Sequence, residues 1–133
     1  MKNLNSSVLL VEDDVDISET LKLILESEGY TVVSCFNGKA ALDWLEQTQK
    51  YPFLILLDVM MPVMNGYEFL ERKSKLSSPL QKIPVVILSA MSHTSVSSHD
   101  VQALLKKPVD IHLLLNTIKK FLPQSETEMK GFI

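Results

Sequence analysis

Short apolar runs separated by longer amphipathic stretches recur along this 133-residue chain. Each run is too short for a typical helix and is followed by polar or turn residues, whereas the stretches between runs have apolar side chains at helical spacing. Strands that alternate with helices in this way form a parallel sheet covered on both faces. The sequence therefore predicts a doubly wound α/β fold with five strands, over residues 8–11, 31–36, 53–57, 85–88 and 103–105.

Helical patterns occupy the stretches between and after these strands. The first places Ile17 and Leu21 on one apolar face and ends near Gly29, and either Asp14 or Asp16 is suited to cap its start. Similar patterns predict three more helices, over residues 37–49, 66–75 and 111–122, and the Ser-Ser-Pro cluster at 77–79 ends the helix over residues 66–75.

The region between the last two strands is different, because residues 92–102 contain four serines and few apolar anchors. It predicts only a short or irregular fourth helix. Residues 123–133 are few and polar, which is typical of a tail. The predicted organisation is one domain over residues 1–122 and a C-terminal tail over residues 123–133.

Charge and composition exclude several classes of function. The chain has 13 Lys and Arg against 16 Asp and Glu, a net charge of −3, so it has no excess of positive charge with which to bind nucleic acid by this domain alone. The longest apolar segment, residues 53–64, is interrupted by Asp58 and Pro62 and is too short to span a membrane. The one cysteine, Cys35, is interpreted as a small buried side chain. A cytoplasmic protein is expected.

The residues at the strand ends are the candidates for chemistry, since an open parallel sheet binds ligands at the carboxyl ends of its strands. Three carboxylates, one hydroxyl and one ammonium group are predicted at that edge, from Glu12, Asp13, Asp58, Ser89 and Lys107. Carboxylates that converge repel one another and favour a hard cation such as Mg²⁺. The histidines lack ligand spacing, which argues against zinc.

An aspartate beside a bound metal ion can act as a nucleophile on phosphorus. Asp58 is the best candidate, because it stands alone after an apolar strand. Lys107 would neutralise charge on the phosphoryl oxygens and the Ser89 hydroxyl would donate a hydrogen bond to one of them. The more ordinary interpretation of the acidic run at residues 12–14 is a helix start, where carboxylates also occur.

Four motifs, in this order and spacing, give the chain a specific resemblance over residues 7–122. They are Val8-Leu9-Leu10-Val11-Glu12-Asp13-Asp14, then Leu56-Leu57-Asp58-Val59-Met60-Met61-Pro62 with Gly66 eight residues after Asp58, then Val86-Ile87-Leu88-Ser89-Ala90, then Lys107-Pro108. The chain resembles the receiver domain of bacterial response regulators. The resemblance implies a flavodoxin-like (βα)5 fold with strand order 2-1-3-4-5.

The resemblance also implies a role for each site residue. Asp58 would be the phosphoacceptor, and Asp13 a direct ligand of Mg²⁺. Glu12 would act on the metal ion through water, and the backbone carbonyl of Met60 would bind it. Ser89 and Lys107 would contact the phosphoryl group, and the Lys107-Pro108 bond would be cis.

The function implied is that of a phosphoacceptor in a two-component phosphorelay. The donor would be a histidine kinase or a histidine phosphotransfer protein, and the signal would pass to a further, unidentified protein. Such a domain catalyses phosphoryl transfer only to itself and is otherwise no enzyme. An aspartyl-phosphate phosphatase would need a second acid at position 60, and a flavin protein a phosphate-binding loop after the first strand, where acidic residues stand.

Leu104 is the main departure from the family pattern, which usually has an aromatic residue three positions before the conserved lysine. Together with the weak fourth helix it supports an alternative. In that alternative, the chain is a receiver-like binding module that acts without regulated phosphorylation.

Overall fold

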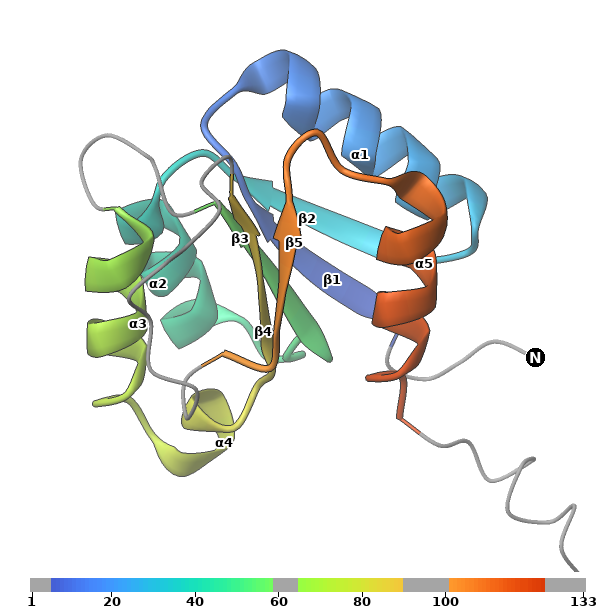
Figure 1. The fold of residues 1–133 in the computed structure, drawn as a ribbon. Helices are drawn as coiled ribbons and strands as arrows, with labels where there is room; N and C mark the ends of the chain where they lie inside the picture. The colour runs from blue at the N-terminus through green and yellow to red at the C-terminus, as the bar shows by residue number, and fades with distance from the viewer. Residues whose placement is uncertain (1–5, 59–64, 90–100, 124–133) are drawn as a thin grey trace, which may run out of the picture.

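A computed structural model describes residues 6–58, 65–89 and 101–123 of the chain. These residues form a parallel sheet in the order β2-β1-β3-β4-β5, which confirms the predicted fold class and strand order (Figure 1). Helices cover both faces of the sheet, with α1 and α5 on one face and α2 and α3 on the other. The strands are β1 (Ser7–Val11), β2 (Thr31–Cys35), β3 (Leu54–Asp58), β4 (Val85–Ser89) and β5 (Ala103–Lys106).

Four helices begin after a polar residue whose side chain accepts a hydrogen bond from the first turn. Asp14 caps α1, Asn37 caps α2, Asn65 caps α3 and Asp110 caps α5, so of the two aspartates proposed for the first helix, Asp14 is the cap. Gly29, with φ of +94°, lies just beyond the end of α1 as the sequence indicates. The helices are α1 (Val15–Ser27), α2 (Gly38–Gln47), α3 (Gly66–Lys73) and α5 (Ile111–Lys119).

The region after α3 differs from the prediction. The helix ends at Lys73, and a separate four-residue helix, α4 (Ser78–Gln81), follows it. Pro79 therefore stands in the first turn of a helix instead of ending one, a position proline tolerates because the backbone N–H there needs no helical partner. The irregular helix predicted over residues 92–102 lies mostly outside the described residues, because residues 90–100 are not described. Most of the predicted tail, residues 124–133, also lies outside them.

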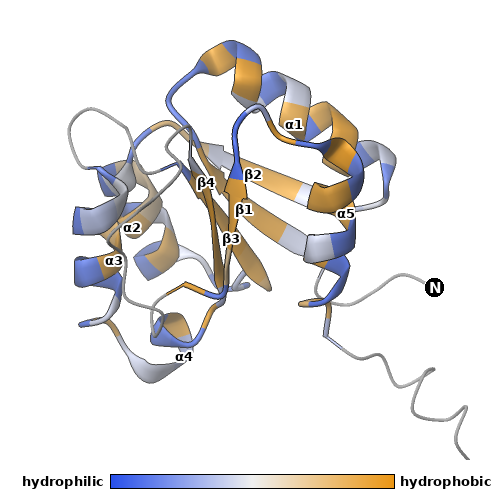
Figure 2. Cartoon of the chain, in the orientation of Figure 1, coloured by the Kyte–Doolittle hydropathy of each residue, from blue (hydrophilic) through white to orange (hydrophobic). Residues whose placement is uncertain are grey.

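Alternate residues of the strands enter two separate cores. Leu9, Val11, Ile55 and Leu57 pack with α2 and α3, and their neighbours along each strand pack with α1 and α5. Figure 2 shows apolar strands between helices that carry both polar and apolar residues. The central strands are buried on both faces, so the ends of β1, β3 and β4 are firmly placed.

No helix in the described part of the chain combines the length and the apolar character that spanning a membrane requires.

Candidate functional site

Three carboxylates meet at the carboxyl edge of the sheet. β1 pairs with β3 so that Val11 lies opposite Leu57, and Glu12 and Asp58 follow these two residues on adjacent strands. Oxygen atoms of Glu12, Asp13 and Asp58 all lie within 4.8 Å of one another. Glu12 and Asp58 are buried and Asp13 is partly exposed. The structure therefore brings together the three acidic side chains that the sequence placed at strand ends.

Lys107 supplies the positive charge of this cluster. Its Nζ lies 3.0 Å from Glu12 Oε1 and 3.5 Å from Asp58 Oδ2, and its side chain is 19% exposed. The backbone N–H of Lys107 donates to the carbonyl of Ser89 at 2.7 Å, which fixes the end of β5 to the end of β4. The Lys107-Pro108 bond is cis, as the resemblance implied. In the part of the chain that the structure describes, the cluster thus holds three carboxylates and one ammonium group, which contacts two of them.

Ser89 is fully buried at the end of β4. Asp58 lies opposite Leu88 in the sheet, so Ser89 follows directly after the partner of Asp58. Its position at the same edge agrees with the sequence prediction. Met60, the other residue predicted to contact a metal ion, lies outside the described residues.

The electrostatics of the cluster are dominated by burial of negative charge. Burial raises the pKa of Glu12 to about 7, the hydrogen bond from Lys107 opposes this rise, and the nearby charge of Asp58 adds to it. For Lys107, burial works to lower the pKa, but the hydrogen bond and the charges of Glu12 and Asp58 outweigh it and the pKa is raised. Lys107 therefore stays charged, whereas Glu12 holds a proton more readily than an ordinary glutamate.

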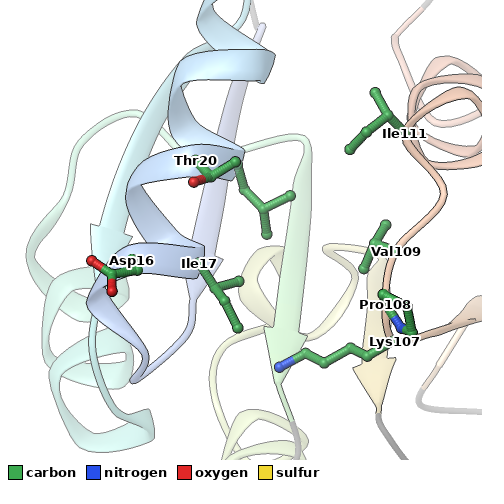
Figure 3. A pocket seen from close by; sticks show the side chains of 8 residues that line it. Asp16, Ile17, Thr20, Lys107, Pro108, Val109 and Ile111 are labelled. Carbon is green, nitrogen blue, oxygen red and sulfur yellow. The ribbon is translucent and has the colours of Figure 1, made fainter.

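A groove of about 570 Å³ lies beside the cluster, between α1 and the segment that joins β5 to α5. Figure 3 shows Ile17 and Thr20 on one side of it and Val109 and Ile111 on the other. Lys107 lines the groove and also contacts Glu12 and Asp58. The sequence did not predict this groove. Helical spacing assigned Ile17 to the buried face of α1, but Ile17 lies at the rim and is 36% exposed.

Leu104 extends from β5 toward the face of the sheet that α2 and α3 cover. Its neighbours Ala103 and Leu105 pack against the core on the other face, and Leu104 itself is 39% exposed. The position at which the resemblance would place an aromatic ring is therefore occupied by a partly exposed aliphatic side chain.

Comparisons with known proteins agree with the fold and show the family. The family described as response regulator receiver domain matches residues 8–119. The chain is 33% identical over 124 residues to sporulation initiation phosphotransferase F of Bacillus subtilis. The match covers 90% of this chain and 96% of that protein. A solved structure of response regulator protein TrrA from Thermotoga maritima, in complex with Mg²⁺-BeF, superposes with a TM-score of 0.77 at 29% identity and covers 92% of this chain and 100% of that one.

Other relatives are longer proteins. The chain is 44% identical over 85 residues to the transcriptional regulatory protein CpxR homolog of Haemophilus influenzae, which covers 64% of this chain. The matched region is 34% of that protein. A second match, to the probable transcriptional regulator ycf29 of Pyropia yezoensis, covers 52% of that protein. The chain thus spans about half or less of these two relatives.

Proposed function

We propose that this chain, which belongs to the response regulator receiver domain family of two-component signalling, accepts a phosphoryl group on Asp58 from a phosphohistidine of a partner protein. The observation that carries the proposal is the ion-pair cluster itself. A buried Asp58 carboxylate lies 3.5 Å from the Lys107 ammonium and beside two further carboxylates. This arrangement provides a nucleophile, a positive charge for the transferred group and a cluster of oxygen ligands.

The transfer makes one bond and breaks one. A carboxylate oxygen of Asp58 forms the new bond to phosphorus while the bond from phosphorus to the donor's imidazole nitrogen breaks. The electron pair of that bond returns to the imidazole, which then takes up a proton from solvent. Asp58 becomes an acyl phosphate, and the chain changes only itself, so its catalysis is limited to its own modification.

The donor set fits Mg²⁺. Glu12, Asp13 and Asp58 offer carboxylate oxygens, the ligands that Mg²⁺ prefers, and no histidine or cysteine belongs to the cluster among the described residues. When bound, the ion would neutralise the charge of the transferring phosphoryl oxygens. We propose Asp13 and Asp58 as its direct ligands, with Glu12 acting through water and the Met60 carbonyl as a further ligand.

Lys107 and Ser89 would act on the phosphoryl group after it reaches Asp58. The Lys107 ammonium lies close enough to Asp58 to exchange part of its contact with Glu12 for a contact with a phosphoryl oxygen. The Ser89 hydroxyl, at the end of the adjacent strand, would donate a hydrogen bond to another. These contacts would tie the new group to β4 and β5.

The test is phosphorylation of the purified chain by acetyl phosphate with Mg²⁺, read by intact mass. We expect the wild-type chain to gain one phosphoryl group and Asp58→Asn to gain none, with unchanged secondary structure by circular dichroism. Asp43→Asn is the matched control, because Asp43 is an exposed aspartate that pairs with Lys39 on α2. Equal labelling of Asp58→Asn and wild type would refute the proposal.

A second candidate function is a binding module that acts without phosphorylation, and the exposed Leu104 favours it. In that case the wild-type chain would gain no phosphoryl group although it binds Mg²⁺. The same experiment therefore separates the two candidates. The donor class, a histidine kinase or histidine phosphotransfer protein, the downstream protein partner and a cytoplasmic location all remain predictions.

A further inference from the structure

We propose that Asp14 is a positioning residue of the acidic site, because it holds the Glu12 carboxylate with its own backbone N–H. This inference rests on the proposed function, since it assumes that Glu12 takes part in a Mg²⁺ site. Asp14 is not a member of the carboxylate cluster. Asp14 instead orients Glu12, which is a member of that cluster.

The two oxygens of Glu12 have different partners. Oε1 accepts from Lys107 Nζ at 3.0 Å, and Oε2 accepts from the Asp14 N–H at 3.2 Å. The carboxylate is therefore held from two directions, by a long side chain from β5 and by the backbone two residues away. Because Glu12 is only 1% exposed, bulk solvent cannot readily replace the N–H as a hydrogen-bond donor if the N–H moves.

The Asp14 N–H is itself held in place by α1. Asp14 Oδ1 accepts from the Ile17 N–H at 3.0 Å, and the Asp14 carbonyl accepts from the Ser18 N–H at 2.9 Å. Ser18 and Leu21 are buried against the sheet, so the first turn of α1 is anchored to the core. A chain of contacts thus runs from the packed helix through the Asp14 cap to Glu12.

This arrangement gives the cap a role beyond helix stability. A carboxylate whose hydrogen-bond partner is fixed presents its oxygens in one orientation, and the loss of such a partner typically weakens metal binding by about 10–100-fold. Removing the Asp14 side chain leaves the N–H present but less well held, so we expect Mg²⁺ binding to weaken by less than it would if the N–H were lost. Removing the N–H itself would give the larger effect.

The experiment is a titration of the metal-free chain with MgCl₂ at constant ionic strength, followed by backbone amide NMR shifts. Asp14→Asn keeps a capping side chain and removes the charge, whereas Asp14→Ala removes both. Asp14→Pro also removes the N–H, and the φ of −77° at this position is one that proline adopts. Asn37→Ala is the matched control, because Asn37 caps α2 by accepting from the Ala40 N–H at 2.8 Å.

We expect Asp14→Asn and Asn37→Ala to bind Mg²⁺ within about twofold of wild type, Asp14→Ala about three- to tenfold more weakly, and Asp14→Pro more weakly still. Equal weakening in Asp14→Asn and Asp14→Ala would overturn the proposal, because charge would then explain the effect. If Asn37→Ala weakened Mg²⁺ binding as much as Asp14→Ala does, the proposal would also be overturned, because general destabilisation of the fold would then explain the effect. Unchanged binding in Asp14→Ala would overturn it too. A wild-type chain that binds no Mg²⁺ would instead reject the proposed function on which the inference rests.

Discussion

Two lysines, the buried Lys73 and the partly exposed Lys107, lie at opposite edges of the sheet, and their surroundings differ. Lys73, the last residue of α3, is 5% exposed and donates to the Gln81 carbonyl in α4 at 2.7 Å, near the start of β4. Lys107, at the carboxyl edge, faces the carboxylates of Glu12 and Asp58. The first ammonium joins two helices through a neutral carbonyl. The second lies, among the described residues, in a cluster with more negative than positive charge, an arrangement that favours binding of a cation.

The largest expected effect comes from replacing each lysine with methionine, which keeps much of the side chain and removes the charge. Lys107→Met is expected to slow phosphorylation by acetyl phosphate by about 100-fold or more, because the group that we propose to stabilise the transferring oxygens is lost. Lys73→Met is expected to leave that rate within about twofold and to lower the free energy of unfolding by about 1–3 kcal/mol, because the Gln81 carbonyl loses its donor. Phosphorylation kinetics and urea unfolding measure the two quantities. A comparable loss of rate in both variants would abolish the distinction between the two edges.

The carboxyl edge could be predicted from the sequence for a physical reason. The strands are short, apolar and buried, so their number and type follow from composition, and parallel strands place their carboxyl ends at one edge. Charged residues directly after such strands must therefore meet, and Glu12, Asp58 and Lys107 do. The roles of these residues are predictions, drawn first from the chemistry of carboxylates beside an ammonium group and then from the family resemblance.

The features that sequence analysis missed depend on contacts between distant elements. Lys73 matches the charged face of an amphipathic helix, and only the position of α4 reveals that it is buried. Ile17 matches the apolar face of α1 but lies at the rim of the groove, because the buried face of the helix is formed by Ser18, Leu21 and Leu25. The bond from the Asp14 N–H to Glu12 has no signal in residue type, since any residue except proline carries that N–H.

A smaller effect is expected from pH, and it sharpens the contrast because it arises from the buried Glu12 carboxylate at the carboxyl edge. The pKa of Glu12 is raised to about 7 in the folded chain by burial, from an ordinary value of 4.5. The folded chain therefore keeps a proton at pH 6 that it has largely lost at pH 8, and that proton competes with Mg²⁺. We expect the affinity for Mg²⁺ to rise about tenfold from pH 6 to pH 8, as the deprotonated fraction does.

The control for the pH effect is Glu12→Gln, in which this dependence should disappear. The free energy of unfolding of the metal-free chain, measured as a function of pH, supplies a second test. Because the folded pKa lies above the unfolded one, the folded state binds more protons between about pH 4.5 and 7, and the contribution of Glu12 to stability is lost as pH rises through that window. An affinity for Mg²⁺ that is independent of pH in the wild-type chain would contradict the assignment of the proton to this cluster.

The smallest expected effect is thermal stabilisation by Mg²⁺, and it compares the two edges within one measurement. An ion that binds only the folded chain at three times its Kd stabilises it by about 0.8 kcal/mol, which corresponds to about 2–5 °C in Tm for a domain of this size. Scanning calorimetry with MgCl₂ and with EDTA measures this shift. Lys73→Met should have a lower Tm in both conditions but the same shift, because its defect lies at the other edge. Asp13→Ala should lose the shift, since one of the three clustered carboxylates is removed. If Asp13→Ala kept the full shift, Mg²⁺ would be binding elsewhere, and the excess of carboxylates at this edge would have to be explained without a metal ion.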